Sequence, residues 1–244
     1  MDWVNKFSET EKLFNEIGVL LKNESFKKSQ VVEVFALTAL RMCRENAGAI
    51  KILLQNGFYC ELMMIIRHQI ELMFRLNWIN SETDSKERIV RTNKIEADAY
   101  RAFQAEITNL RSNRSRRFFN EDFIKKAQKI IDDIKSENPQ LLADNGNFMR
   151  LEKNETMAGD LREKYYPQYR YLCMFTHPNP SLREFHLTAN QGKDIFKSFE
   201  QSYIYAMKVF KINLNIIINL LGNQLKNMKK IKEIQQIFNE FVGE

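Results

Sequence analysis

The segment that decides the fold is FYCELMMIIRHQIELMFRLNWIN, residues 58–80. Its apolar residues recur at steps of three and four, the spacing that places side chains on one face of an α-helix. The segment contains no Gly or Pro, and the Asn56-Gly57 pair just before it is typical of the end of a preceding helix. The sequence therefore predicts a long helix from Phe58 to about Asn80.

The same apolar spacing extends outward from this helix in both directions. Ser29 can cap the helix before it, and Ser81 and Asp84 can cap the polar helix after it. The expected helices, besides the one above, cover residues 7–21, 31–54, about 86–110, about 121–136, about 191–221 and about 223–241.

Turn-forming residues are scarce and concentrated in one region. The 244 residues include 8 Gly and 4 Pro, too few for the frequent turns of an all-β protein. All four Pro and the Asn145-Gly146 pair lie within residues 137–190. No composition break marks a domain boundary. We therefore predict an all-α fold: one helical bundle over residues 1–244, with an irregular, Pro-containing insertion near 137–190.

Charge and cysteine content indicate the compartment and the class of partner. The net charge of +6 is compatible with a polyanionic partner such as RNA. Three Cys without a close pair favour a reducing compartment over a disulfide framework or a zinc site. Charged residues or Asn interrupt both of the most apolar stretches, 62–76 and 209–221, and no signal peptide is visible. We expect a cytoplasmic protein without a membrane helix.

Two charges interrupt an apolar stripe of the 58–80 helix. Arg67 and Glu71 follow Met64 at helical spacing and precede Phe74 and Trp78, whereas Glu61, His68 and Arg75 mark the polar side. Three interpretations are open: an i,i+4 ion pair, weakened by the Arg-before-Glu order; a polar pocket in which Glu71 orients Arg67 toward an anion; or an exposed stripe.

A second polar pattern is YYPQYRYLCMFTHP, residues 165–178. After Pro167 we expect a helix that ends before Pro178, with Arg170 and His177 on one face because they are seven residues apart. His177 at the helix end either interacts with the helix dipole or lies at the edge of a cleft. If both patterns belong to one site, the two helices are neighbours, with Arg67 and His177 opening on a shared cleft.

The Arg170–His177 spacing resembles the signature of the HEPN superfamily, in which His follows Arg by a few residues. The 58–80 helix together with the Thr176-His177-Pro178 block also resembles an uncharacterised bacterial helical family. The HEPN resemblance implies a helical bundle and a homodimer whose motifs face one cleft. It further implies metal-independent RNA cleavage by a toxin or effector of phage defence, partnered by an antitoxin or another defence protein. This chain departs from the pattern at Tyr171, where many active members have a polar residue.

Under this resemblance, the residue types suit cleavage through the RNA 2′-hydroxyl. His177 has a side chain that moves protons near neutral pH, and Arg170 can stabilise a charged phosphorane. Arg67, oriented by Glu71, is a candidate phosphate clamp. The basic run of Arg111, Arg114, Arg116 and Arg117 either holds the RNA backbone or is a solvated helix junction. No metal-ligand cluster and no phosphate-binding or hydrolase motif stands out, so we expect neither a metal nor another cofactor.

The sequence is also compatible with two other functions. A non-catalytic protein of the same fold would bind a ligand or a partner, a hypothesis favoured by Tyr171. A helical adaptor would use residues 191–241 as its partner surface, since residues 209–221 are apolar nearly all round.

Overall fold

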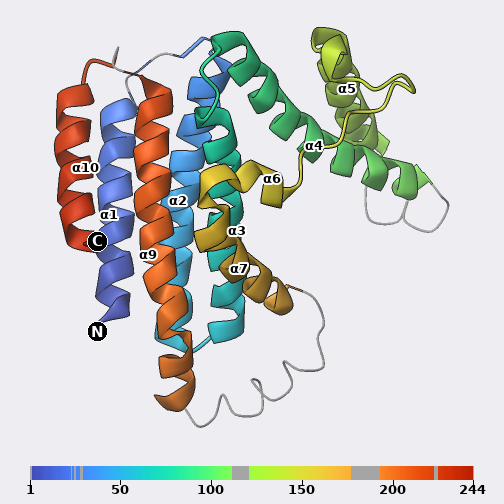
Figure 1. Ribbon diagram of the computed structural model, residues 1–244. Helices are drawn as coiled ribbons and strands as arrows, with labels where there is room; N and C mark the ends of the chain where they lie inside the picture. The colour runs from blue at the N-terminus through green and yellow to red at the C-terminus, as the bar shows by residue number, and fades with distance from the viewer. Residues whose placement is uncertain are drawn as a thin grey trace. The chain divides into compact units, whose positions relative to one another are not determined.

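The computed structural model describes residues 2–22, 24, 26–27, 30–111, 121–176, 193–222 and 225–243. Over these ranges the chain is almost entirely helical (Figure 1), which confirms the predicted all-α class. The helices are α1 (Trp3–Leu21), α2 (Val31–Asn56), α3 (Tyr59–Asn80), α4 (Ser85–Arg111), α5 (Glu121–Glu137), α6 (Asn154–Ala158), α7 (Arg162–Leu172), α9 (Lys193–Leu221) and α10 (Met228–Val242). Short 3₁₀ turns cover Pro139–Leu141, Gly159–Leu161 and Cys173–Phe175.

Local signals in the sequence set several of these helix ends. Gly57, with φ 73°, adopts the left-handed conformation that ends α2, and its N–H donates to the Leu54 carbonyl at 3.3 Å. Asp84 caps α4 as predicted, because its Oδ1 accepts from the backbone N–H groups of Lys86 at 2.7 Å and Glu87 at 3.0 Å. The predicted cap at Ser29 lies outside the described residues.

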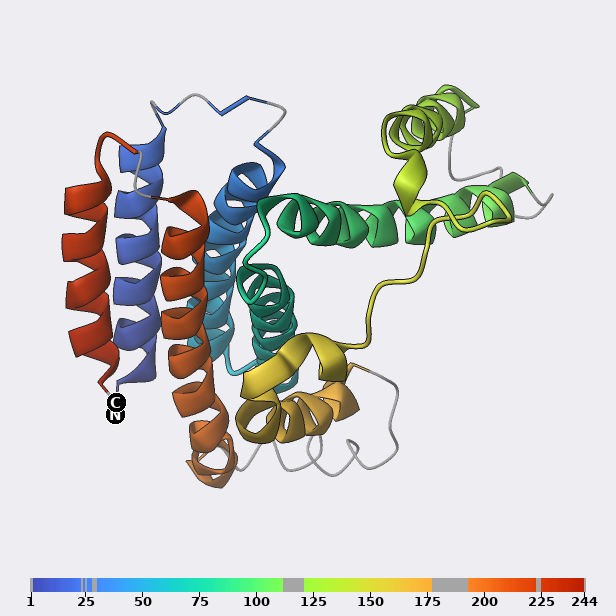
Figure 2. The same ribbon diagram turned by 45° about the horizontal axis from the view of Figure 1, so that its top comes forward.

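The helices divide into two compact units, one from residues 1–81 and 154–244 and one from residues 82–153. We call them the bundle unit and the inserted unit. In the bundle unit, α9 packs against α2, α3 and α10, α1 packs against α2 and α10, and α6 and α7 lie against α3 (Figure 2). The expectation of one domain over residues 1–244 stays a prediction, since compactness does not test cooperative folding.

Helix α9 forms the centre of the bundle unit. Phe210, Leu214 and Ile217 are fully buried. The stretch Phe199–Leu221 is the one part of the described chain that is long and apolar enough to cross a membrane, with a mean hydropathy of 1.4, and 61% of it is buried inside the protein. Its contacts on several sides are those of a core helix.

The inserted unit has its own small core. Its buried residues come from α4, α5 and the segment that follows them, and they are Ala97, Ile107, Ala127, Ile131, Leu141 and Phe148. After α5 the chain makes a tight turn in which Gly146 has φ 72° and the Ala143 N–H donates to the Asn147 carbonyl at 2.8 Å. The predicted Asn145-Gly146 turn is therefore confirmed, as is irregular structure in the described part of residues 137–190.

Candidate functional site

The Arg67 side chain bridges α3 and the end of α7. Its Nη2 donates to the Tyr169 hydroxyl at 3.1 Å, and its Nε donates to Cys173 Sγ at 3.4 Å. The guanidinium carbon lies 5.1 Å from the centroid of the Tyr169 ring, within the range of a cation–π contact. The predicted proximity of the two helices is thereby confirmed, and Arg67 connects them.

Glu71 lies between two arginines of its own helix. Its Oε2 is 3.3 Å from Arg67 Nη2, and its Oε1 accepts from Arg75 Nη2 at 2.7 Å. The shorter contact is the one in which Glu precedes Arg, the more favourable order on a helix. The i,i+4 ion pair is therefore present, and the exposed-stripe interpretation is wrong, since the Glu71 side chain is only 15% exposed.

The most buried face of α3 is not the one containing Arg67. Leu62, Met63, Ile66, Gln69, Ile70 and Met73 are all fully buried, whereas Met64 is 40% exposed. Arg67 and Glu71 lie on the flank of this face, where α7 partly covers them. A half-buried flank shields an ion pair from water without removing its solvation entirely, which makes the two charges tolerable there.

Both polar and aromatic contacts fix α7 in the bundle unit. Gln168 Nε2 donates to Ser202 Oγ of α9 at 3.1 Å, and the Tyr169 ring packs edge-on against Phe74 of α3 at 5.7 Å. The helix begins at Arg162, so the prediction that it follows Pro167 is wrong. Pro167 is exposed within the helix, while Tyr165 and Tyr169 on either side are buried and hold both halves in place.

Burial and the neighbouring charges set the protonation states of Tyr169 and Arg67. Burial raises the pKa of the Tyr169 phenol, and the Arg67 charge offsets part of that rise. For Arg67, burial lowers the pKa, but the contacts with Cys173, Tyr169 and Glu71 outweigh burial and leave the pKa above its usual value. Tyr169 is therefore neutral and Arg67 charged at neutral pH, and Arg67 holds α7 against α3. The polar pocket in which Glu71 orients Arg67 toward an anion stays a prediction.

The other predicted site residues lie apart from this contact or outside the described ranges. Arg170 is exposed on α7, and its side chain has no hydrogen bond or ion pair to Arg67, Glu71 or any other described residue. His177, Arg114, Arg116 and Arg117 fall outside the described ranges, and Arg111 is the last residue of α4. The shared cleft of Arg67 and His177 therefore stays a prediction, and Tyr169 and Cys173 supply the cross-helix contacts of Arg67.

The sequence interpretation missed a buried polar cluster at the centre of the bundle unit. Cys43 Sγ of α2 donates to Gln69 Oε1 at 3.4 Å, and Asn213 Nδ2 of α9 donates to the same oxygen at 3.1 Å. Burial raises the pKa of the Cys43 thiol, which keeps it protonated. A Gln among Met and Ile at helical spacing, and Asn213 inside an apolar run, were the available signals.

An acidic hollow opens beside α7. About 730 Å³ in volume, it is lined by Glu155, Asp160 and Glu163 together with Gly159, Arg162, Tyr166 and Pro167. Three carboxylates disfavour a phosphate there. In the described part of the chain, no group of three or more His, Cys, Asp or Glu is arranged to hold a metal ion.

Comparison with known proteins places this chain in a family. A comparison with curated proteins found no match, and a comparison with solved structures found none. The sequence pattern of the DUF5677 family, described as a family of unknown function, matches residues 33–194 of the 244. The match runs from α2 into the start of α9 and includes Arg67, Glu71, Arg170 and His177. The chain is a member of the DUF5677 family.

Proposed function

We propose that the chain is a metal-independent RNA endonuclease whose reacting groups are Arg170 and His177. The observation that carries the proposal is the exposed Arg170, which has no carboxylate partner among the described residues and stands on a helix anchored to α3 and α9. An arginine on a fixed helix, with no carboxylate partner in the described part of the chain, is well suited to meet a phosphate.

The chemistry is transesterification followed by release of the RNA. The 2′-oxygen attacks the adjacent phosphorus, the 5′-oxygen leaves, and a 2′,3′-cyclic phosphate forms. His177 takes the 2′-hydroxyl proton or supplies a proton to the leaving oxygen, and Arg170 stabilises the negative charge of the phosphorane. Arg67 acts as a positioning residue, because it fixes α7 through Tyr169 and Cys173.

The active assembly is a homodimer in the cytoplasm. Two copies of the chain form a homodimer that brings two Arg170–His177 pairs to one cleft, and the basic run Arg111, Arg114, Arg116 and Arg117 holds the RNA backbone. The three free cysteines suit the reducing cytoplasm. There the protein acts as a toxin or effector of phage defence, restrained by an antitoxin or another defence protein.

Cleavage of RNA in the presence of EDTA tests the proposal. Purified protein is incubated with transfer RNA and with a labelled single-stranded RNA, and the products are separated on a denaturing gel. We expect cleavage by the wild type, none by His177→Ala, and a loss of about a hundredfold or more with Arg170→Ala, comparable to removing one transition-state donor. Lys164→Ala removes one exposed charge from the same helix and is the matched control. Equal cleavage by wild type and His177→Ala rejects the proposal.

A second candidate is a non-catalytic binding protein, and Tyr171 favours it. This side chain is 39% exposed next to Arg170, and its ring packs edge-on against Phe175 at 5.7 Å. An exposed aromatic ring beside an Arg that has no ion pair with any described residue suits contact with a partner as well as catalysis. Size-exclusion chromatography with light scattering, run alongside the cleavage assay, distinguishes the two. A dimer that fails to cleave any RNA supports the binding protein.

A further inference from the structure

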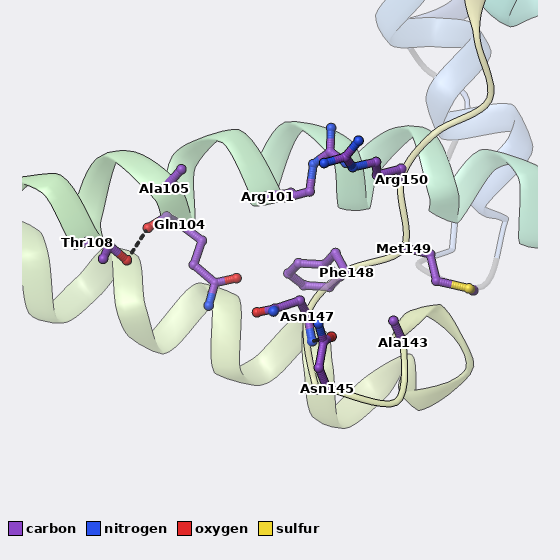
Figure 3. A pocket seen from close by; sticks show the side chains of 10 residues that line it. All are labelled: Arg101, Gln104, Ala105, Thr108, Ala143, Asn145, Asn147, Phe148, Met149 and Arg150. Atoms are coloured by element: carbon purple, nitrogen blue, oxygen red, sulfur yellow. Dashed lines mark hydrogen bonds between the residues drawn. The ribbon is translucent and has the colours of Figure 1, made fainter.

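A pocket of about 600 Å³ lies entirely within the inserted unit, between α4 and the segment that follows α5 (Figure 3). Its lining residues are Arg101, Gln104, Ala105, Thr108, Ala143, Asn145, Asn147, Phe148, Met149 and Arg150. The volume falls within the range of small-molecule binding sites, about 300–1,000 Å³. The pocket shares no residue with the proposed cleavage site.

Helix α4 supplies one wall through a single face. Arg101, Gln104, Ala105 and Thr108 follow the i, i+3, i+4, i+7 spacing that aligns side chains along a helix. The Thr108 hydroxyl donates to the Gln104 carbonyl at 2.9 Å, so it is already bonded within the helix (Figure 3). Ala105 and Ala143 are small and exposed, which leaves the space between the walls open.

The charges around the pocket favour an anion. None of its lining residues is acidic, and two are Arg. Arg101 Nη2 lies 2.6 Å from Asp98 Oδ1 on its own helix, whereas Arg150 is exposed and has no ion pair among the described residues. Figure 3 shows both guanidinium groups on the same side of Phe148. Arg150 therefore contributes an uncompensated positive charge, and a guanidinium binds a phosphate with two parallel hydrogen bonds.

Amide groups and an apolar floor complete the lining. The side-chain amides of Gln104 and Asn147 have no hydrogen-bond partner among the described residues, and Figure 3 shows Gln104 extending from α4 toward Asn147. The Asn147 N–H donates to Asn145 Oδ1 at 3.1 Å, which fixes the turn that presents both Asn side chains. Asn and Gln amides match the paired donors and acceptors on the edges of nucleic-acid bases. Phe148, only 3% exposed, forms the floor beside Met149.

We propose that this pocket binds a nucleotide, with Arg150 and Arg101 on the phosphate and Gln104, Asn145 and Asn147 around the base. A sugar phosphate is smaller and would leave the apolar floor and the amides unused. The nucleotide is either free or one residue of a single-stranded RNA, since both present the same phosphate and base. The proposal does not depend on cleavage at Arg170 and His177.

Isothermal titration of the full-length chain tests the proposal. The titrants are the four ribonucleoside 5′-monophosphates, with inorganic phosphate, ribose 5-phosphate and adenosine as comparators. We expect at least one monophosphate to bind with one site per chain, and each comparator to bind about tenfold or more weakly, because each lacks the base or the phosphate. A short single-stranded RNA is titrated into His177→Ala protein, in which the RNA stays intact, with and without the monophosphate. If the monophosphate competes with the RNA, the pocket binds one residue of a single-stranded RNA. If the two bind independently, the pocket binds a free nucleotide.

Paired variants locate the binding in this pocket. Arg150→Ala is expected to weaken binding about tenfold or more, since a charge-assisted contact is lost, and Ala105→Leu is expected to abolish it by filling the space. Lys153→Ala and Ala102→Leu change exposed residues of the same two segments outside the pocket and should bind as the wild type does. No binding of any monophosphate, equal binding of phosphate or ribose 5-phosphate, or binding unchanged in both pocket variants would overturn the proposal.

Discussion

The Tyr169 hydroxyl connects three elements of the bundle unit through one oxygen atom. It accepts from Arg67 Nη2 of α3 at 3.1 Å and from Asn154 Nδ2 of α6 at 2.7 Å, while Tyr169 itself belongs to α7. Tyr169 is 8% exposed, so water has little access to replace either bond. Loss of this oxygen removes the partner of the Asn154 amide and one of the two partners of the charged Arg67 Nη2, which keeps only Glu71.

Substituting Tyr169→Phe measures the contribution of this oxygen. We expect a loss of about 1–3 kcal/mol in the free energy of unfolding, because donors in a part-buried site lose their acceptor. Urea denaturation followed by circular dichroism gives the value. Tyr171→Phe is the control, since it removes a hydroxyl from a more exposed ring of the same helix. An equal urea midpoint for Tyr169→Phe and the wild type would contradict a stabilising role of the Tyr169 hydroxyl.

For single residues, the sequence identified Arg67 and Glu71 but not the residues that contact Arg67 across the helices. Arg67 and Glu71 stand out because they interrupt an apolar stripe. Tyr169 and Cys173 lie about a hundred residues further along, and no local pattern indicates which of several Tyr side chains meets Arg67. The sequence does not single out Gln69, because one amide within an apolar run is typical of a surface position. Its buried partner, Asn213, lies on a different helix, α9.

A helix end can be predicted from the sequence where a local capping residue sets it. Asp84 was expected to cap α4, and it does, because a cap depends on residues two and three positions away. The start of α7 was misplaced because tertiary contacts on both sides of Pro167 outweigh its local effect. The nucleotide pocket was not foreseen, since it combines α4 with a turn some forty residues later.

Removal of the Asp84 side chain tests how much this cap stabilises the start of α4. Asp84→Ala should destabilise the start of α4 by about 0.5–2 kcal/mol, because the N–H groups of Lys86 and Glu87 lose their acceptor. Hydrogen exchange of the first-turn amides should accelerate accordingly. Asp144→Ala removes an exposed carboxylate of the same unit that makes no described hydrogen bond, and it should leave exchange in α4 unchanged. Identical exchange in both variants argues against a capping role.

At the scale of the whole molecule, α10 belongs to the core of the bundle unit. Phe238 is fully buried and packs edge-on against Phe14 of α1 at 5.7 Å, and Asn227, just before α10, donates through Nδ2 to the Leu20 carbonyl at 2.9 Å. Helix α9 is likewise covered by α2, α3 and α10. The apolar surface of α9 is therefore covered by other helices of the bundle unit.

Two adjacent residues of α10 provide a test of this packing. Phe238→Ala should cost about 3–5 kcal/mol, because it leaves a cavity between α1 and α10. Ile237→Ala should cost little, since Ile237 is 55% exposed. Urea denaturation of both variants gives the comparison. If Phe238→Ala unfolds at the same urea concentration as the wild type, α10 does not contribute to the core.

The split of the bundle unit between two ends of the described chain has a consequence for biosynthesis. About 110 residues separate Ser81 from the start of α9, and the ribosome, adding roughly 5–20 residues per second, takes on the order of ten seconds to make them. During that interval α2 and α3 have emerged without the helix that covers them, whereas the inserted unit is contiguous and can close as soon as it is made. The apolar faces of α2 and α3 are then exposed to chaperones and to neighbouring nascent chains until α9 leaves the exit tunnel.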